Sequence, residues 1–217
     1  MMQALTDFFL LAMTAIFLEN AIFTRALGTS RMLIAAKRAD QIFVFGILIT
    51  VITTCASIFT CVANMLLMQY SWWYLVEPLC YVVCMCVVFL LIRYALKDFF
   101  PGLYDKVGQM LPLATFNGAV LGPLLLSGHQ GYDFWQYFAF GLGSGIGYTM
   151  ALLLVCEGQK RLRRTNLPRA FRGLPISLLY IGILSLVFYG LIGHQLPFRS
   201  IAGRFSRKIC TNADSVL

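Results

Sequence analysis

The chain has 217 residues, of which 59% are apolar and only 12% carry a charge, and its mean hydropathy is +0.78. Soluble proteins carry charge on about a quarter of their residues, so this composition excludes an ordinary water-soluble globule. The formal net charge is +8, but so few charges over so much apolar chain do not make a nucleic-acid surface. We interpret the basic excess as a signature of membrane topology.

Apolar stretches long enough to cross a bilayer occur six times. A helix needs about 20 residues to cross a hydrocarbon core about 30 Å thick. In chain order the predicted spans cover about residues 8–27, 42–68, 73–96, 107–126, 134–156 and 174–196. The first run has no small-residue cleavage pattern after it, so we expect it to stay in the protein. The prediction is an all-α membrane protein with six transmembrane helices.

The positive charges predict the orientation of these spans. Of the 17 Lys and Arg residues, 13 follow spans one, three and five, and the other four lie in the C-terminal tail. Because Lys and Arg in short loops favour the cytoplasmic side, those loops are predicted to be cytoplasmic and both termini to lie outside. Trp72, Trp73 and Trp135 then gather at the outer interface as an aromatic belt. The basic tail favours the opposite orientation, but three separate loops agree with one another.

Polar and ionisable residues inside the predicted spans gather in spans one and four. Span one carries Glu19 and Asn20, with Arg25 near its cytoplasmic edge, and span four carries Thr115 and Asn117. Such groups are costly in a bilayer, so they are usually paired, face a cavity or serve a function. The candidates to line an ion or electron path are therefore Glu19, Asn20, Thr115 and Asn117.

Spans one and four occupy the same place in two halves of the chain. Span four is interrupted by Pro112, Asn117, Gly118, Gly122 and Pro123. Irregular backbone inside a membrane survives only where it is buried in protein or lines a polar cavity. Corresponding interrupted segments in two three-span halves indicate an inverted repeat with a site between the halves. We predict one three-span repeat over residues 1–97, a second over 98–197, and a polar basic tail over 198–217.

A structural interpretation of the same residues stays open. Glu19 and Arg25 are close enough to form a stabilising ion pair or to extend toward the interface. The run from Gly141 to Gly147 has four glycines, but it lies inside a span and lacks the spacing of a nucleotide-binding loop. Small residues four apart instead predict close helix packing.

The cysteines predict packing rather than a metal site. Six of the seven lie in spans two, three and five, and Cys210 lies in the tail. Cys80 and Cys84 share one helix face and would present two soft ligands, but no His or carboxylate stands near them at ligand spacing. Free cysteine also packs as a small apolar residue. His129 and His194 are predicted to lie at the outer interface.

Three segments resemble one family of membrane proteins. They are LENAIFTRALG at residues 18–28, LPLATFNGAVLG at 111–122 and PRAFRG at 168–173. This pattern resembles the integral membrane subunits of the Rnf/Nqr ion-translocating electron-transport complexes, over about residues 5–195. Termini outside are typical of the RnfA/NqrE type rather than the RnfE/NqrD type, whose topology is opposite.

The resemblance implies a partner and a shared cofactor. Two such six-span subunits of opposite topology form a pseudo-symmetric pair in this family, and each gives two cysteines to an intramembrane [2Fe–2S] cluster. In this sequence those two positions hold Ser30 and Gly118. We therefore predict that the chain supplies no ligand to such a cluster and holds no cofactor by itself.

Two functional hypotheses follow. The first is an RnfA-like membrane subunit of a Na⁺- or H⁺-coupled electron-transport complex in a bacterial-type inner membrane, divergent in lacking its own cluster ligands and without a catalytic residue. The second is a non-redox transporter or assembly scaffold on the same inverted-repeat fold, with a small ion or solute bound at the broken spans.

Overall fold

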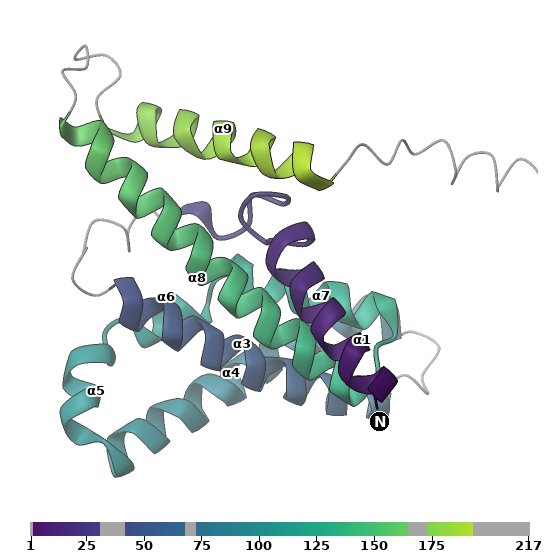
Figure 1. Cartoon of the computed structure of the whole chain (residues 1–217). Helices are drawn as coiled ribbons and strands as arrows, with labels where there is room; N and C mark the ends of the chain where they lie inside the picture. Colours follow the sequence, from purple (N-terminus) through teal and green to yellow (C-terminus); the bar gives the residue numbers. More distant parts are fainter. Residues whose placement is uncertain (1, 31–41, 68–72, 165–172, 193–217) are drawn as a thin grey trace, which may run out of the picture.

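The structure is a computed structural model that describes residues 2–30, 42–67, 73–164 and 173–192 (Figure 1). These residues form helices joined by short connections, and no strand occurs among them, which confirms the all-α prediction. The elements are α1 (Met2–Met13), the π-helical turn η1 (Thr14–Leu18), α3 (Ile42–Leu67), α4 (Trp73–Phe99), α5 (Pro101–Val107), α6 (Leu111–Thr115), α7 (Gly118–Gln130), α8 (Phe134–Arg164) and α9 (Leu174–Ile192).

Four helical segments are long and apolar enough to cross a membrane. They are Ile42–Leu67, Leu75–Phe99, Leu111–Gln130 and Phe134–Leu162, and they confirm predicted spans two to five. Two shorter apolar helices, Thr6–Leu18 and Leu174–Gly190, stand where spans one and six are predicted. The count of six spans and the inverted repeat therefore stay predictions.

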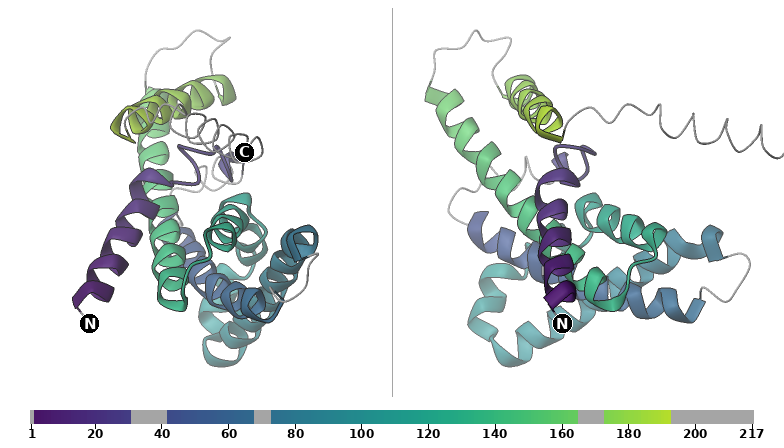
Figure 2. Two further views of the ribbon diagram at one scale, coloured as in Figure 1. Left: turned by 90° about the vertical axis from the view of Figure 1, so that its right-hand side faces the viewer. Right: turned by 45° about the vertical axis from the view of Figure 1, so that its right-hand side comes forward.

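Helix α8 is the central element, with α3 on one side and α1 on another (Figures 1 and 2). It runs antiparallel to α3 and parallel to α1, and its glycines make both contacts close. Gly141 and Gly145 lie against α3, whereas Gly143 and Gly147 lie against α1 and the turn that follows it. This arrangement confirms that the glycine run serves helix packing, because each missing Cβ lets a neighbouring backbone approach.

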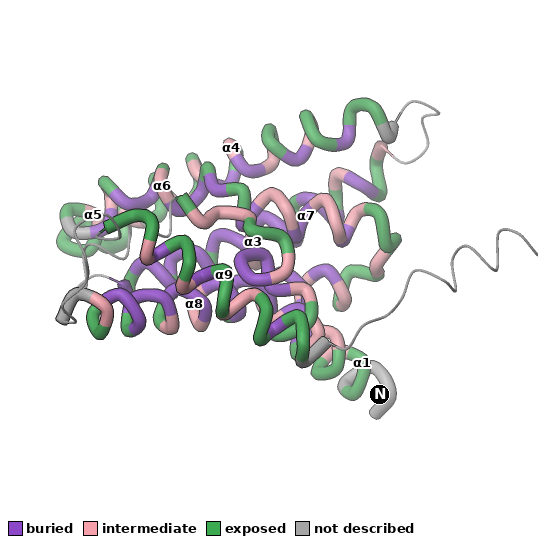
Figure 3. The backbone as a smooth tube through the Cα atoms, turned by 90° about the horizontal axis from the view of Figure 1, so that it is seen from above, coloured by how far each residue is buried: buried purple, intermediate pink, exposed green. Residues whose placement is uncertain are grey.

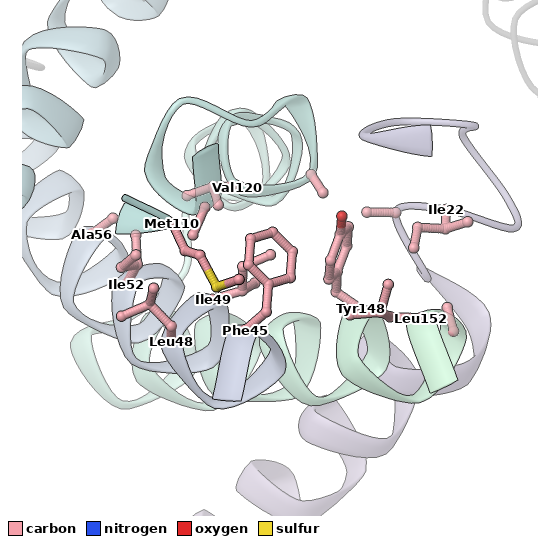
Figure 4. Close-up of a cluster of buried hydrophobic side chains, with 14 of the residues drawn as sticks. Ile22, Phe45, Leu48, Ile49, Ile52, Ala56, Met110, Val120, Tyr148 and Leu152 are labelled. Atoms are coloured by element: carbon pink, nitrogen blue, oxygen red, sulfur yellow. The ribbon is translucent and has the colours of Figure 1, made fainter. Parts of the chain in front are cut away.

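The core lies where α3, α7 and α8 meet. Phe45, Ile49 and Ile52 of α3 and Leu152 of α8 are almost completely buried there (Figure 4). Many other large apolar side chains, especially on α4 and α9, are exposed on the outside of the bundle (Figure 3). A helical bundle that is apolar both inside and outside is typical of a protein surrounded by lipid rather than by water.

Several sequence predictions fall outside the described residues. These are Trp72, His194, Cys210, the tail, most of the PRAFRG segment and many of the basic residues that predict topology. Within the described ranges the six cysteines form no disulfide bond. In the same ranges no three His, Cys, Asp or Glu side chains lie close enough together to bind a metal ion. His129 is largely exposed at the end of α7, as an interfacial residue would be.

Candidate functional site

The first helix ends at an irregular segment whose residues 20–23 are buried. α1 passes into the π-helical turn η1, which ends where the Glu19 N–H donates to the Thr14 carbonyl at 2.9 Å. From Glu19 to Gly28 the chain is irregular, with Ala26 (φ 55°) and Gly28 (φ 76°) both left-handed. π-helical turns and left-handed non-glycine residues are uncommon and gather at functional sites. The helix predicted to continue to about residue 27 therefore ends at Leu18, and we call the irregular residues 19–28 the first interruption.

Asn20 organises this irregular segment. Its side chain is 1% exposed, and its Oδ1 accepts hydrogen bonds from the N–H groups of Ile22 and Phe23, at 3.1 and 3.4 Å. Its Nδ2 donates to the carbonyl of Ile16 at 3.1 Å and to the carbonyl of Gly147 in α8 at 3.0 Å. The amide thus replaces helix hydrogen bonds that the chain loses after Leu18, and it ties the segment to α8.

The second interruption separates α6 from α7 at Phe116 and Asn117. Asn117 has an extended backbone (φ −123°, ψ 133°) and is the N-cap of α7, where its Oδ1 accepts from the Ala119 N–H at 3.3 Å. Its Nδ2 donates to the hydroxyl of Tyr148 in α8 at 3.1 Å. Asparagine is among the best N-cap residues because its side chain satisfies an otherwise unpaired backbone N–H.

The prolines of span four do not cause its interruption. Pro112 lies in the first turn of α6, where it has no hydrogen bond to lose, and Pro123 lies inside α7, which continues to Gln130. The helix instead ends at Thr115, before the capping residue Asn117. Of the residues predicted to interrupt span four, Pro112 and Pro123 do not break the helix, whereas the break does lie at Asn117.

The two interruptions meet at consecutive residues of α8. Asn20 bonds to Gly147 and Asn117 bonds to Tyr148. The turn at Gly28 lies directly on Asn117, because a Cβ on Gly28 would stand 2.6 Å from the Asn117 Oδ1. The structure therefore brings together segments that are far apart in the sequence.

Tyr148 is the residue of this site that sequence reasoning missed. Its ring is 1% exposed and lies between Phe45 of α3 and Ile22 of the first interruption (Figure 4). In the sequence it follows Gly147 at the end of the glycine run, where it looks like one more apolar residue. The one signal in the sequence that could have identified Tyr148 is its hydroxyl group in an otherwise apolar stretch. A Tyr hydroxyl that is buried needs a hydrogen-bond partner, so it points to a polar neighbour.

The other two predicted candidates, Glu19 and Thr115, make no hydrogen bond to Gly147 or Tyr148 among the bonds that the structure shows for them. Thr115 is fully buried, and its hydroxyl donates to the Leu111 carbonyl of its own helix at 2.9 Å. Glu19 pairs with Arg25, with 2.8 Å between Oε2 and the guanidinium. Burial raises the pKa of Tyr132, in the turn between α7 and α8, and the negative charge of Glu19 raises it further.

We expect Glu19→Gln to change the free energy of unfolding little. The side chains of Glu19 and Arg25 are 32% and 44% exposed, and an exposed ion pair contributes about 1 kcal/mol or less. Thermal unfolding of the protein in lipid nanodiscs measures the change, with Glu157→Gln at the exposed end of α8 as the matched control. A loss several times larger would show that the Glu19–Arg25 pair holds the interruption together.

The residues at the family's cluster positions do not fit an iron–sulfur cluster. Gly118 has no side chain, and Ser30 is exposed and offers a hydroxyl in place of a thiol. The described cysteines stand on α3, α4 and α8, and none is in either interruption. Thiolates hold such clusters, so these two segments supply no cluster ligand among the described residues.

Helices of membrane-spanning length, together with two interruptions at buried asparagines, define a polytopic membrane protein with irregular backbone in its interior. The chain belongs to the Rnf-Nqr subunit family of membrane proteins, whose family model matches residues 8–194.

Proteins of similar sequence align with this chain over most of its length. One, from Azoarcus sp. (strain BH72), is named as a subunit of an ion-translocating oxidoreductase complex and is 31% identical over 87% of this chain and 98% of its own length. Another, from Acetobacterium woodii, is named as a subunit of a Na⁺-translocating ferredoxin:NAD⁺ oxidoreductase complex and is 30% identical over 84% of this chain and 95% of its own length. The family resemblance predicted from the three segments is confirmed.

Proposed function

We propose that this chain is an RnfA-like membrane subunit of a redox-driven, Na⁺- or H⁺-translocating complex. Its relatives are named as subunits of ion-translocating oxidoreductase complexes, and the match covers nearly their full length. The observation that carries the proposal is the meeting of two interrupted helices at Gly147 and Tyr148 of α8. Irregular backbone held by buried amides is the usual construction of an ion or substrate site in membrane proteins.

The two halves of the chain are proposed to be inverted repeats, over residues 1–97 and 98–197. Asn20 and Asn117 support this assignment, because each side chain accepts a hydrogen bond from the backbone N–H two residues later in its own half. Helices α3 and α8, which would be the second helices of the two repeats, pack antiparallel at close-approaching glycines. Equivalent helices of an inverted repeat meet in this way at the pseudo-two-fold axis.

The proposed location is the cytoplasmic membrane, with both termini outside. The distribution of Lys and Arg supports this orientation, and the partner would be a second six-span subunit of opposite topology. In this complex the chain would hold the irregular segments in position through Asn20 and Asn117 and would flank the ion path with Glu19. Thr115, whose hydroxyl bonds within α6, would keep the helix turn before the interruption intact.

Purification of the tagged chain from its native membrane tests this assignment. We expect flavin- and iron–sulfur-bearing proteins to copurify in a mild detergent, together with a second six-span subunit. Na⁺- or H⁺-coupled transport in proteoliposomes should then require Asn117, and Asn117→Ala should abolish it while the complex still assembles. A chain that purifies alone, with wild-type transport in the variant, would contradict both the assembly and the site.

The chain is further proposed to supply no ligand to a [2Fe–2S] cluster, because Ser30 and Gly118 stand at the family's ligand positions. We expect the purified chain alone to contain no stoichiometric iron and to give no cluster signal in electron paramagnetic resonance. A stoichiometric signal that disappears when the cysteines of this chain are changed to serine would contradict the prediction.

A non-redox transporter or assembly scaffold is the second candidate function, and the same two substitutions favour it. It predicts solute or ion movement, or assembly of a partner, without any dependence on electron donors. One experiment distinguishes the two candidate functions: transport is measured with and without a reduced electron donor. Only the first function requires transport to depend on the oxidation of that donor.

A further inference from the structure

A buried carboxylate lies outside the site described above. Glu77 stands near the start of α4 and is only 4% exposed. Its Oε1 and the hydroxyl of Tyr81 fill the space beside Gly128 of α7 that a Cβ would otherwise need. An ionisable group buried in this way is costly unless it is paired or takes part in function.

Glu77 is one end of a row of polar groups that crosses the bundle. The Tyr81 hydroxyl faces both the Glu77 carboxylate and the hydroxyl of Tyr137 in α8. Tyr137 in turn accepts a hydrogen bond from the Nδ2 of Asn64 in α3, at 3.1 Å. All three of these further side chains are buried. Helices α3, α4 and α8 thus contribute to one continuous polar row inside an otherwise apolar core.

The exposed imidazole of His129 lies next to the Glu77 end of this polar row. The Nδ1 of His129 lies 3.4 Å from the Oε2 of Glu77. The side chain of His129 is 71% exposed, whereas that of Glu77 is only 5% exposed. His129 stands in the last turn of α7, one residue before the helix ends. The imidazole of His129 therefore lies between the Glu77 carboxylate and the surface.

The groups around Glu77 suit a proton better than a metal cation. Its neighbours from α4, α7 and α8 are two phenols and an imidazole, and no third His, Cys, Asp or Glu completes a metal site among the described residues. The other titratable groups whose charge influences this region are the Cys61 thiol of α3, which acts on Tyr137, and the Asp133 carboxylate, which acts on Cys61. Hydrogen-bonding groups in a row relay a proton, whereas Na⁺ and other hard cations need several oxygen ligands.

We propose that Glu77 is a proton-binding site that exchanges protons with the surface through His129, at the end of the bundle where α7 leads into α8. The imidazolium N–H bond at Nδ1 breaks, and the proton forms an O–H bond with Oε2 of Glu77. The neutral imidazole keeps its proton at Nε2, and after its exposed ring turns toward water, Nδ1 takes a proton from hydronium or a buffer acid, whose conjugate base stays in solution. Protonation neutralises a buried charge, and the Tyr81 hydroxyl lies beside the carboxyl group, where it can donate to the charged form or accept from the neutral one. A role in translocation rests on the proposed function, but the protonation itself does not.

Infrared difference spectroscopy on the full chain in lipid nanodiscs tests this site. After a light-triggered pH drop, a carboxylic acid C=O band reports protonation of a buried carboxylate. We expect Glu77→Gln to remove this band and Glu157→Gln, at an exposed position of α8, to leave it unchanged. A band that persists in Glu77→Gln would overturn the proposal, whatever proteins copurify with the chain.

The shuttle is tested by a second variant at an exposed position, which should fold normally. We expect His129→Ala to slow the appearance of the band by about a hundredfold, in the range of positioned acid–base groups. Free imidazole in the buffer should restore the rate, which a merely structural role of His129 would not allow. An unchanged rate in His129→Ala, or a slow rate that imidazole does not restore, would show that protons reach Glu77 by another path.

Discussion

Gly28→Ala is expected to lower the free energy of unfolding by about 4 kcal/mol, because two costs combine at this position. The backbone of Gly28 is left-handed, with φ 76°, a conformation that costs an L-residue about 1 kcal/mol or more. A Cβ would also stand 2.6 Å from the Asn117 Oδ1 and 2.7 Å from the Ala119 Cβ. Both neighbours lie at the start of α7, so the two interruptions would be forced apart. Equilibrium unfolding in a mixed-detergent titration measures the loss.

Gly118→Ala is the matched control, because it adds the same methyl group on the other side of the same contact. A Cβ on Gly118 meets no atom closer than 3.7 Å, and the residue lies in the first turn of α7. We expect a change within about 0.5 kcal/mol, or a small gain from reduced backbone freedom in the unfolded chain. Equal losses in the two variants would contradict the close contact of the interruptions.

Asn20→Ala is expected to cost about 3 kcal/mol of stability, because it leaves two buried N–H groups unpaired. Ile22 and Phe23 donate to the Asn20 Oδ1, and both residues are buried. Each unsatisfied donor costs about 1–3 kcal/mol, whereas the lost hydrogen bond to the Gly147 carbonyl contributes less than about 1 kcal/mol on average between membrane helices. The same mixed-detergent titration measures the effect.

Thr14→Ala serves as the control for Asn20→Ala, because it removes a hydrogen bond of purely local range in the same segment. The Thr14 hydroxyl donates to the Leu10 carbonyl of the preceding helix turn. We expect a change below about 0.5 kcal/mol. If Asn20→Ala were as mild as this control, the amide would not be what holds residues 19–28 in place.

The parts of the fold that depend on local pattern were predictable from the sequence. Hydropathy over about 20 residues locates the four long helices, and the spacing of Gly141 to Gly147 predicts the close packing of α8. The interruptions were also predictable as positions, because Asn20 and Asn117 are polar groups in apolar runs. The part assigned to the prolines was wrong, because Pro112 begins α6 and Pro123 lies inside α7, whereas Asn117 caps α7 two residues beyond the end of α6.

The partners of the buried polar groups could not be predicted, because they are far apart in the sequence. Asn20 and Gly147 are separated by 127 residues, and Asn64 and Tyr137 by 73. Hydropathy treats Tyr81, Tyr137 and Tyr148 as ordinary members of apolar helices. Which of them faces a carboxylate or an amide depends on how the helices rotate against one another, and a single sequence does not contain that information.

The attachment of both interruptions to one turn of α8 has a thermodynamic consequence. Because Gly147 and Tyr148 are neighbours on a rigid helix, a shift of either interruption relative to α8 changes the environment of the other. A ligand that bound at one segment would therefore bias the conformation of the second, and the second would bias that binding by the same factor, because linkage is reciprocal. One turn of α8 thereby connects the segment around Asn20 with the segment around Asn117.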